Sequence, residues 1–154
     1  MNRISVIGGL LKKIYRMYAQ ELLGQLQQKG FTDLRPSFLE VLLFISENEG
    51  PSIKQVGQGC GLKKQTMTSH LNELENRGYI ERRLNPSDRR EQKVHLTDYG
   101  EKFKLALMES VREIETNYEH LVGDVELDRI EHTLKNFYER LDKKAGELDL
   151  GPAL

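Results

Sequence analysis

The sequence predicts a mainly α-helical fold with one small β hairpin, and three observations support this. Apolar residues recur every three or four positions over most of the 154-residue chain, which is typical of helices. Two β-leaning segments, residues 79–84 and 92–96, flank one charged stretch near the middle. Hydrophobic residues make up 38% of the chain and charged residues 31%, which fits a soluble, helix-rich protein with a single core.

A long helix is expected over residues 4–28, ending at Lys29-Gly30. Its apolar stripe covers a wider arc than packing against one core requires, so we expect it to contact a second chain as well. The stripe holds Ile4, Ile7, Leu11, Ile14, Tyr18 and Leu22. A second helix is expected to begin near Pro36, a favourable first-turn residue. Its predicted core residues are Phe38, Val41, Leu42 and Ile45.

Residues 53–78 are expected to form two helices joined by a tight bend at Gly61. The first helix has apolar residues three and four positions apart, ending at Cys60. The second has an apolar face and an opposite face of short, uncharged, hydrogen-bonding side chains, and Gly78 ends it. The apolar face holds Met67, Leu71 and Leu74, and the polar face holds Gln65, Ser69, Asn72 and Asn76.

A charged hairpin is expected to project after these two helices. Residues 85–91, opened by Asn85-Pro86, are expected to form a loop too long and too charged to be a minimal hairpin turn. Ser52-Ile53 is expected to pair with this hairpin as a short edge strand. A helical pair followed by a basic hairpin is the pattern of a winged helix-turn-helix.

Two long helices are expected after the hairpin. Thr97 is well placed to cap the first, with Asp98 in its first turn. Its apolar repeat breaks at Gly123-Asp124 and then resumes, which predicts a helical hairpin with a short connection. Residues 146–154 have little to pack and are expected to be a frayed tail.

From about residue 52 to residue 103 the chain resembles the MarR family of winged helix-turn-helix transcriptional regulators. The motifs that carry the resemblance are Thr66-Met67-Thr68, Leu74-Glu75, Arg77-Gly78-Tyr79-Ile80, Asp88-x-Arg90 and Val94-x-Leu96-Thr97-x-x-Gly100. The resemblance implies a single domain over residues 1–154. In it, helices at 4–30 and 98–145 form a dimerisation layer, and residues 35–97 bind DNA. It also implies a homodimeric repressor of a pseudo-palindromic operator.

The polar face of the helix between Gly61 and Gly78 is the predicted DNA-reading surface. Amide and hydroxyl side chains there can hydrogen-bond base edges in the major groove, and side chains near its start can reach phosphates. The predicted base-contacting residues are Gln65, Ser69 and Asn72, and the predicted phosphate-contacting residues are Lys64, Thr66 and Thr68. The family often has a basic residue at the position of Ser69, so the base preference does not transfer.

The wing is the second predicted DNA contact, through Asp88, Arg89 and Arg90. In the resembled family the arginine that matches Arg90 enters the minor groove. We expect the Asp88 carboxylate, two residues away, to orient that guanidinium. The competing interpretation of the wing is an ordinary exposed charge cluster.

Charge and cysteine usage indicate a cytoplasmic protein with a polyanionic partner. The net charge is −1, yet residues 62–93 carry eight Lys/Arg against five Asp/Glu, and residues 124–149 carry eight Asp/Glu against five Lys/Arg. The single cysteine, Cys60, suits a reducing compartment and is interpreted as an inert core thiol. No stretch approaches the roughly 20 apolar residues of a membrane span.

The sequence indicates a binding protein and not an enzyme. The four histidines lack metal-ligand spacing, and neither a nucleophile–base arrangement nor a glycine-rich phosphate loop is present, so no metal or cofactor is expected. The resemblance implies a small aromatic effector in a crevice that Tyr15, Arg16 and Tyr18 are placed to line. Ordinary packing is the favoured interpretation of those residues, so the effector site stays unassigned.

Two other function classes remain open. The winged helix can serve as a protein-interaction module without specific DNA binding, or the chain can be a purely structural helical dimer. Salt-dependent binding to duplex DNA separates both classes from a DNA reader.

Overall fold

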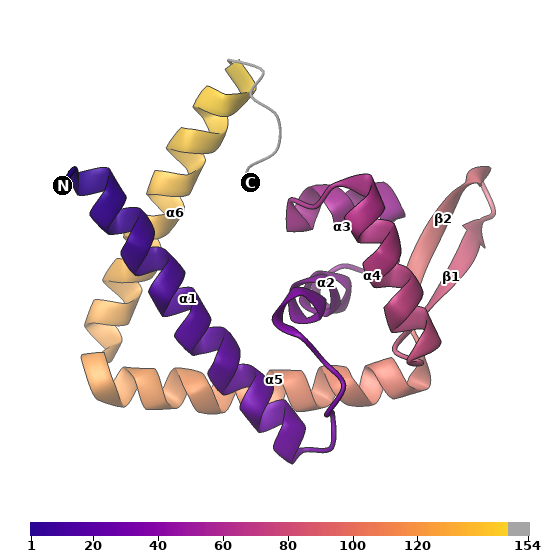
Figure 1. Cartoon of the computed structure of the whole chain (residues 1–154), viewed down its shortest axis with the longest axis horizontal. Coiled ribbons are helices and arrows are strands. Elements are labelled where there is room, and N and C mark those ends of the chain that lie inside the picture. The colour runs from indigo at the N-terminus through magenta and orange to yellow at the C-terminus, as the bar shows by residue number, and fades with distance from the viewer. Residues whose placement is uncertain (148–154) are drawn as a thin grey trace. The chain divides into compact units, whose positions relative to one another are not determined.

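The computed structural model describes residues 1–147, except for the side chains of Arg89 and Glu147. Most of the predicted tail, residues 148–154, therefore lies outside the described residues. The chain divides into two compact units, residues 1–111 and the residues from 112 onward. The elements, labelled in Figure 1, are α1 (Arg3–Gln28), α2 (Pro36–Glu47), α3 (Ile53–Cys60), α4 (Lys64–Asn76), β1 (Ile80–Asn85), β2 (Asp88–Leu96), α5 (Asp98–Val122) and α6 (Asp124–Glu147).

The predicted fold class, mainly α with a small β wing, is confirmed, and the predicted starts of the first two helices agree with the structure to within one residue. The core of the first unit is formed by the predicted apolar faces of α2 and α4 together with β1, β2 and the start of α5. Its largest fully buried side chains are Tyr79, Phe38, Phe103, Leu26, Leu42, Met67, Leu71, Leu74, Ile80 and Leu107.

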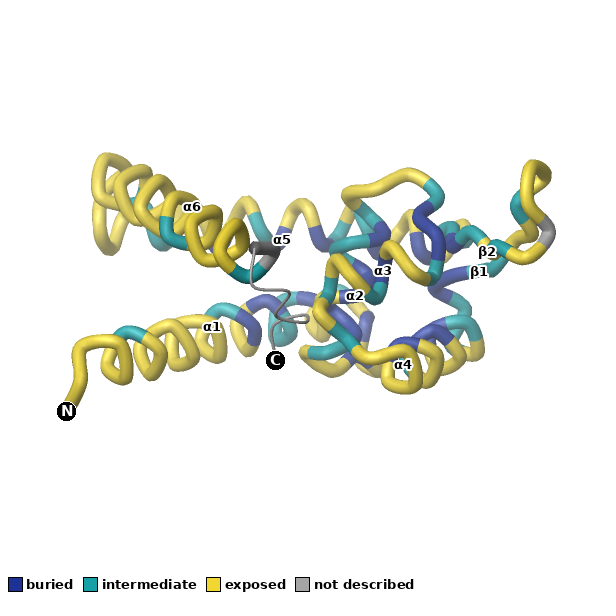
Figure 2. Tube along the Cα trace, turned by 90° about the horizontal axis from the view of Figure 1, so that it is seen from above, coloured by how far each residue is buried: buried dark blue, intermediate teal, exposed yellow. Residues whose placement is uncertain are grey.

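Helix α1 contributes only its C-terminal half to this core. Leu22 and Leu26 are buried, whereas Ile4, Ile14 and Met17 are 61%, 57% and 67% exposed. Figure 2 shows the same change along α1, from exposed at its N-terminal end to buried near its C-terminal end. The wide apolar stripe therefore has two parts, and the part near Leu22 and Leu26 is the one buried in the first unit.

The predicted pairing of the connection before α3 with the wing is found at Ser52, as an isolated bridge, whereas Ile53 is the first residue of α3. Ser52 caps α3 in a capping box: its hydroxyl accepts from the Gln55 amide at 3.1 Å, and the Gln55 side chain accepts from the Ser52 amide at 2.9 Å. Ser52 also pairs with Lys93, and the amide of the next residue, Val94, donates to the Pro51 carbonyl at 2.8 Å. At the other end of α3, Gly61 takes a left-handed conformation that makes the bend.

The prediction of a loop over residues 85–91 was wrong. Strands β1 and β2 are antiparallel, and Asn85 pairs with Asp88 across a turn formed by Pro86 and Ser87. The Asn85 side chain accepts from the Ser87 amide at 3.0 Å, and this local hydrogen bond stabilises a turn shorter than composition suggested. Residues 89–91 have no partners in β1 and form a bulge in β2.

The start of α5 packs closely against residues 78 and 79, between α4 and β1. The Thr97 hydroxyl accepts from the Gly100 amide at 3.0 Å, which confirms the predicted N-cap, and it donates to the Gly78 carbonyl. The Thr97 amide donates to the Tyr79 carbonyl at 3.1 Å. A Cβ atom on Gly100 would lie 2.1 Å from that same carbonyl oxygen, so this position has room only for glycine.

The helical hairpin predicted for the C-terminal region was also wrong. In the second unit, α6 leaves Gly123 in a new direction instead of folding back along residues 112–122 of α5 (Figure 1). Gly123 has a φ of 88°, and this left-handed residue turns the chain at a corner. The stripe of α6 stays open as a result, with Leu134 and Leu141 40% and 56% exposed. None of the helices within the described residues is long and apolar enough to span a membrane.

Candidate nucleic-acid interface

Helix α4 presents the polar surface that its sequence predicts. The predicted contact residues on it are all exposed, namely Lys64, Gln65, Thr66, Thr68, Ser69 and Asn72. The opposite face is buried through Met67, Leu71 and Leu74. The N-cap residue, Lys63, makes no side-chain cap, so the first amides of α4 point outward without an intramolecular side-chain acceptor. Such a helix start suits an anion.

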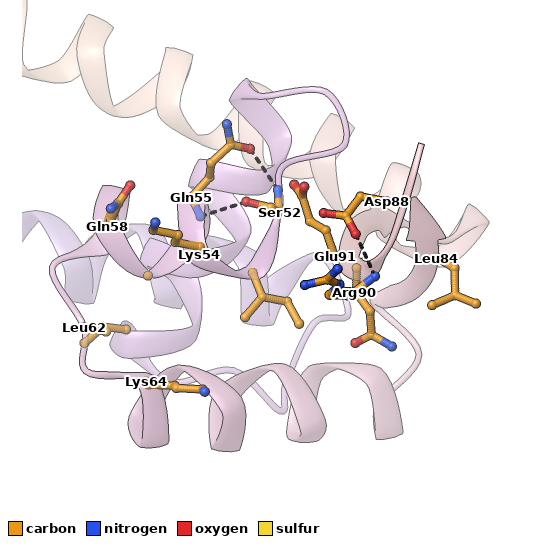
Figure 3. Close-up of a pocket in the computed structure, with 13 residues that line it drawn as sticks. Ser52, Lys54, Gln55, Gln58, Leu62, Lys64, Leu84, Asp88, Arg90 and Glu91 are labelled. Atoms are coloured by element: carbon orange, nitrogen blue, oxygen red, sulfur yellow. Dashed lines mark hydrogen bonds between the residues drawn. The ribbon is translucent and has the colours of Figure 1, made fainter. Parts of the chain in front are cut away.

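A groove of about 1010 Å³ lies beside this helix start, between α3, α4 and the wing (Figure 3). Three of its lining side chains are basic and come from three different elements: Lys54 from α3, Lys64 from α4 and Arg90 from β2. Asp88 and Glu91 of β2 also line it. The groove therefore places cations from the helix-turn-helix and from the wing around one concave surface.

At the wing, the structure corrects the expected role of Asp88. Within the described residues, the Asp88 carboxylate accepts a hydrogen bond from the backbone amide of Arg90 at 3.0 Å. A short carboxylate reaches the amide two residues on more readily than the end of a long side chain. Asp88 thus holds the bulge backbone from which Arg90 projects, and the Arg90 side chain remains exposed. The Arg89 side chain lies outside the described residues.

Arg82 joins the wing to α4, a role that was not predicted from the sequence. From β1 its guanidinium donates to both carboxylate oxygens of Glu75, at 3.0 and 3.3 Å, and to the side-chain oxygen of Asn72 at 2.7 Å. The hydrogen bond from Arg82 lowers the pKa of Glu75. The sequence signal that could have indicated this contact is an acidic and a basic residue, Glu75 and Arg82, on either side of the helix-ending Gly78.

Behind α4, an aromatic and cationic cluster fixes the helix on α2. The His70 ring meets the Phe38 ring edge-on at 5.2 Å, and the guanidinium groups of Arg35 and Arg77 lie 4.3 and 5.1 Å from the Phe38 ring centre. Burial and then the charge of Arg35 lower the pKa of His70. The neutral imidazole is therefore the form that fits this cluster.

Tyr15, one of the aromatic residues that could line an effector crevice, contacts α2 within the first unit. The Tyr15 hydroxyl donates to the Glu40 carboxylate at 2.5 Å, and the Tyr15 and Tyr18 ring centres are 6.4 Å apart. Burial is the main cause that raises the pKa of both phenols. Arg16 is exposed. Tyr15 thus ties α1 to α2 in the single chain.

Cys60 carries a protonated thiol. It is half-buried, its sulfur lies 3.7 Å from the Glu40 carbonyl oxygen, and burial raises its pKa to about 11. A thiol with that pKa is a poor nucleophile at neutral pH. Among residues 1–147, no three His, Cys, Asp or Glu side chains gather as metal ligands.

Comparisons with known proteins agree on one family. The sequence pattern of the MarR family matches residues 32–91. The HTH-type transcriptional regulator SarZ of Staphylococcus aureus (strain MRSA252) is 30% identical over 108 residues, which cover 68% of this chain and 72% of SarZ. The HTH-type transcriptional regulator TtmR of Methylorubrum extorquens (strain PA1) is 38% identical over 69 residues, 45% of this chain, and the match spans only 35% of TtmR.

One similar solved structure is the transcriptional repressor CouR bound to a 23-mer DNA duplex. Its TM-score to this chain is 0.75 at 25% identity, and the match covers 90% of this chain and 96% of CouR.

Proposed function

This chain belongs to the MarR family and is a DNA-binding transcription regulator, and from that premise we propose that it is a cytoplasmic repressor that binds a pseudo-palindromic operator as a homodimer. The observation that carries the proposal is the exposed, uncharged polar face of α4 beside a groove lined by three basic side chains. The DNA-bound repressor CouR, which has the same fold, supports it.

In this proposal α4 enters the major groove. The exposed side chains of Gln65 and Ser69 face base edges, with Asn72 one turn further along the same face. Lys64, at the helix start, contacts a phosphate together with the uncapped amides. Thr66 and Thr68 contribute further phosphate hydrogen bonds.

The wing contacts the minor groove through its bulge. Arg90 is exposed, and the hydrogen bond from its backbone amide to Asp88 fixes the backbone that carries the guanidinium. A cation placed in a narrow minor groove gains from the enhanced negative potential there. Arg89, predicted as a second contact, neighbours it in the same bulge.

The exposed apolar surfaces support the homodimer. The N-terminal half of α1 and the stripe of α6 leave large side chains in water, among them Ile4, Leu10, Ile14, Met17, Leu134 and Leu141. A soluble protein rarely leaves apolar side chains clustered along a helix in water unless another chain covers them. A two-fold dimer presents two α4 helices, about 34 Å apart on one face of the duplex, to two half-sites.

A small aromatic acid or phenol that relieves repression completes the proposal. The aromatic side chains of Tyr15 and Tyr18 on α1 support it, since Tyr15 hydrogen-bonds to Glu40 of α2 and the Tyr18 ring lies near the Tyr15 ring. Titration calorimetry with benzoate, with and without operator DNA, tests this part independently of DNA binding.

The main experiment is selection of duplexes from a random pool, followed by fluorescence titration at several salt concentrations. A dimeric reader with several phosphate contacts selects a palindromic sequence and loses on the order of 10³ in affinity between 50 and 200 mM salt. A protein-interaction module or a structural dimer selects no sequence and shows no such salt dependence.

A further inference from the structure

The contact between Arg82 and Asn72 bears on which base the protein selects. Asn72 lies on the exposed face of α4, in line with Gln65 and Ser69 at spacings of seven and three residues. Arg82 comes from β1, and its Nη2 donates to the Asn72 Oδ1 at 2.7 Å. A residue of the wing thus occupies one hydrogen-bonding atom of a residue on the reading face.

The chemistry of arginine fixes the orientation of the Asn72 amide. A guanidinium has only donors, so the atom of Asn72 that it meets must be the carbonyl oxygen. The NH₂ group of Asn72 is then the part left for a ligand. Asn72 thus offers a ligand chiefly a hydrogen-bond donor, because one lone pair of its oxygen is engaged by Arg82.

Glu75 holds Arg82 in this position. The two carboxylate oxygens of Glu75 accept from Nη2 and Nε at 3.0 and 3.3 Å, which fixes the plane of the guanidinium. The Arg82 side chain is 21% exposed, whereas that of the neighbouring Arg83 is 59% exposed. Arg83 pairs with Glu81 on its own strand and has no recorded contact with α4 in the described residues.

We propose that Arg82 is a positioning residue that engages the Asn72 oxygen, so that Asn72 presents its NH₂ group to the DNA and selects guanine over adenine. The inference rests on the proposed function. Bidentate recognition of adenine needs an acceptor for N6–H and a donor for N7, and Arg82 holds the Asn72 oxygen toward the wing and engages one of its two lone pairs. Guanine offers two acceptors, O6 and N7, to the two N–H donors of the NH₂ group, whereas adenine offers only N7 and thymine only O4.

The test compares two arginine variants that lose the same charge from the same strand. Affinities of the wild type, Asn72→Ala, Arg82→Met and Arg83→Met are measured at one salt concentration against every single-base substitution of one operator half-site. The Asn72→Ala variant identifies the position that Asn72 reads. Circular dichroism melting verifies that each variant is folded.

We expect the wild type to prefer guanine at that position. Arg82→Met frees the Asn72 oxygen, and the preference shifts toward adenine on the order of tenfold, the discrimination of one good bidentate pair. Arg83→Met weakens binding to all sequences alike and leaves the preference unchanged, because it removes only wing charge.

Three results overturn the inference. If Arg82→Met and Arg83→Met give the same base preferences, Arg82 does not set the preference, while operator binding stands. If the wild type prefers adenine at the position that Asn72→Ala identifies, the inference fails even where Arg82→Met does not fold. If the wild type selects no sequence from a random pool, the proposed function fails first and the inference with it.

Discussion

Gly100→Ala should destabilise the protein, although alanine is normally the better residue inside a helix. Gly100 is in the first turn of α5, and a Cβ there would lie 2.1 Å from the Tyr79 carbonyl oxygen and 3.1 Å from the Leu96 Cβ. Ordinary carbon–oxygen contacts are about 3.3 Å or longer. The backbone at Tyr79 or the start of α5 must therefore move by about 1 Å.

The magnitude follows from three contributions to the free energy of unfolding. Overpacking of this kind costs about 1–3 kcal/mol. A shift of the Tyr79 carbonyl also weakens its hydrogen bond with the Thr97 amide, which contributes about 1 kcal/mol. Helix propensity offsets about 1 kcal/mol of that loss. The net loss is about 1–3 kcal/mol, or roughly 2–12 °C in Tm for a chain of this size.

Gly24→Ala is the matched control. Gly24 is also helical, in α1, but a Cβ there meets nothing within 4 Å. This variant should gain about 0.5–1 kcal/mol from propensity alone. Calorimetric melting at one protein concentration measures both variants. If Gly100→Ala melts at or above the wild-type temperature, the close contact with Tyr79 does not constrain the junction and the reasoning fails.

Four further predictions concern binding, assembly and pH. Arg90→Ala should weaken operator binding by about 1–3 kcal/mol without dissociating the dimer; unchanged affinity in a fluorescence titration contradicts this. Gln65→Ala should relax base preference at one position per half-site, whereas Lys64→Ala should weaken all sequences alike; a uniform loss for both across an operator panel refutes the assignment. Deleting residues 1–20 should abolish both the dimer and operator binding, and a folded full-length monomer in analytical ultracentrifugation at micromolar concentration argues against that mechanism. Because burial lowers the pKa of His70 from its ordinary 6.5, its contribution to stability is present above pH 6.5 and is lost as the pH falls below it. Urea unfolding at pH 7 and pH 5 should thus show a smaller acid loss for His70→Gln, and equal losses show that another group is responsible.

The helix-turn-helix was predictable because its signals are local. Met67, Leu71 and Leu74 recur at helical spacing, and all three are buried. Gly78 follows the end of α4 with a φ of 86°, the conformation that a C′ glycine supplies. The Thr97 cap needs only one hydroxyl and the amide of Gly100. Each of these features depends on residues within one or two helical turns.

The features that were missed depend on distant partners. The register of the wing is set by how Asn85 and Asp88 pair, and charge composition does not show this. The helical hairpin was predicted wrongly from the apolar stripe of α6. Such a stripe indicates that the helix packs against a partner, but it does not identify which segment the partner is. Arg82 was missed because its role comes from Glu75 and Asn72, on a different element, and in the sequence it is one charged residue among many.

The bulge in β2 allows the sequence and length of the wing tip to change without altering the strand pairing. Residues 89–91 are additional to the strand pairing, and the ladder from Ile80–Leu96 to Leu84–Gln92 is complete without them. Insertions, deletions or changes of charge in this segment therefore leave the register of the sheet, and the attachment of Arg82 to α4, as they are. A lineage can lengthen or recharge its wing tip to suit a new promoter while it keeps the reading helix unchanged. For a protein engineer, grafting tips of different charge onto one unaltered scaffold is the corresponding way to adjust binding strength separately from sequence choice.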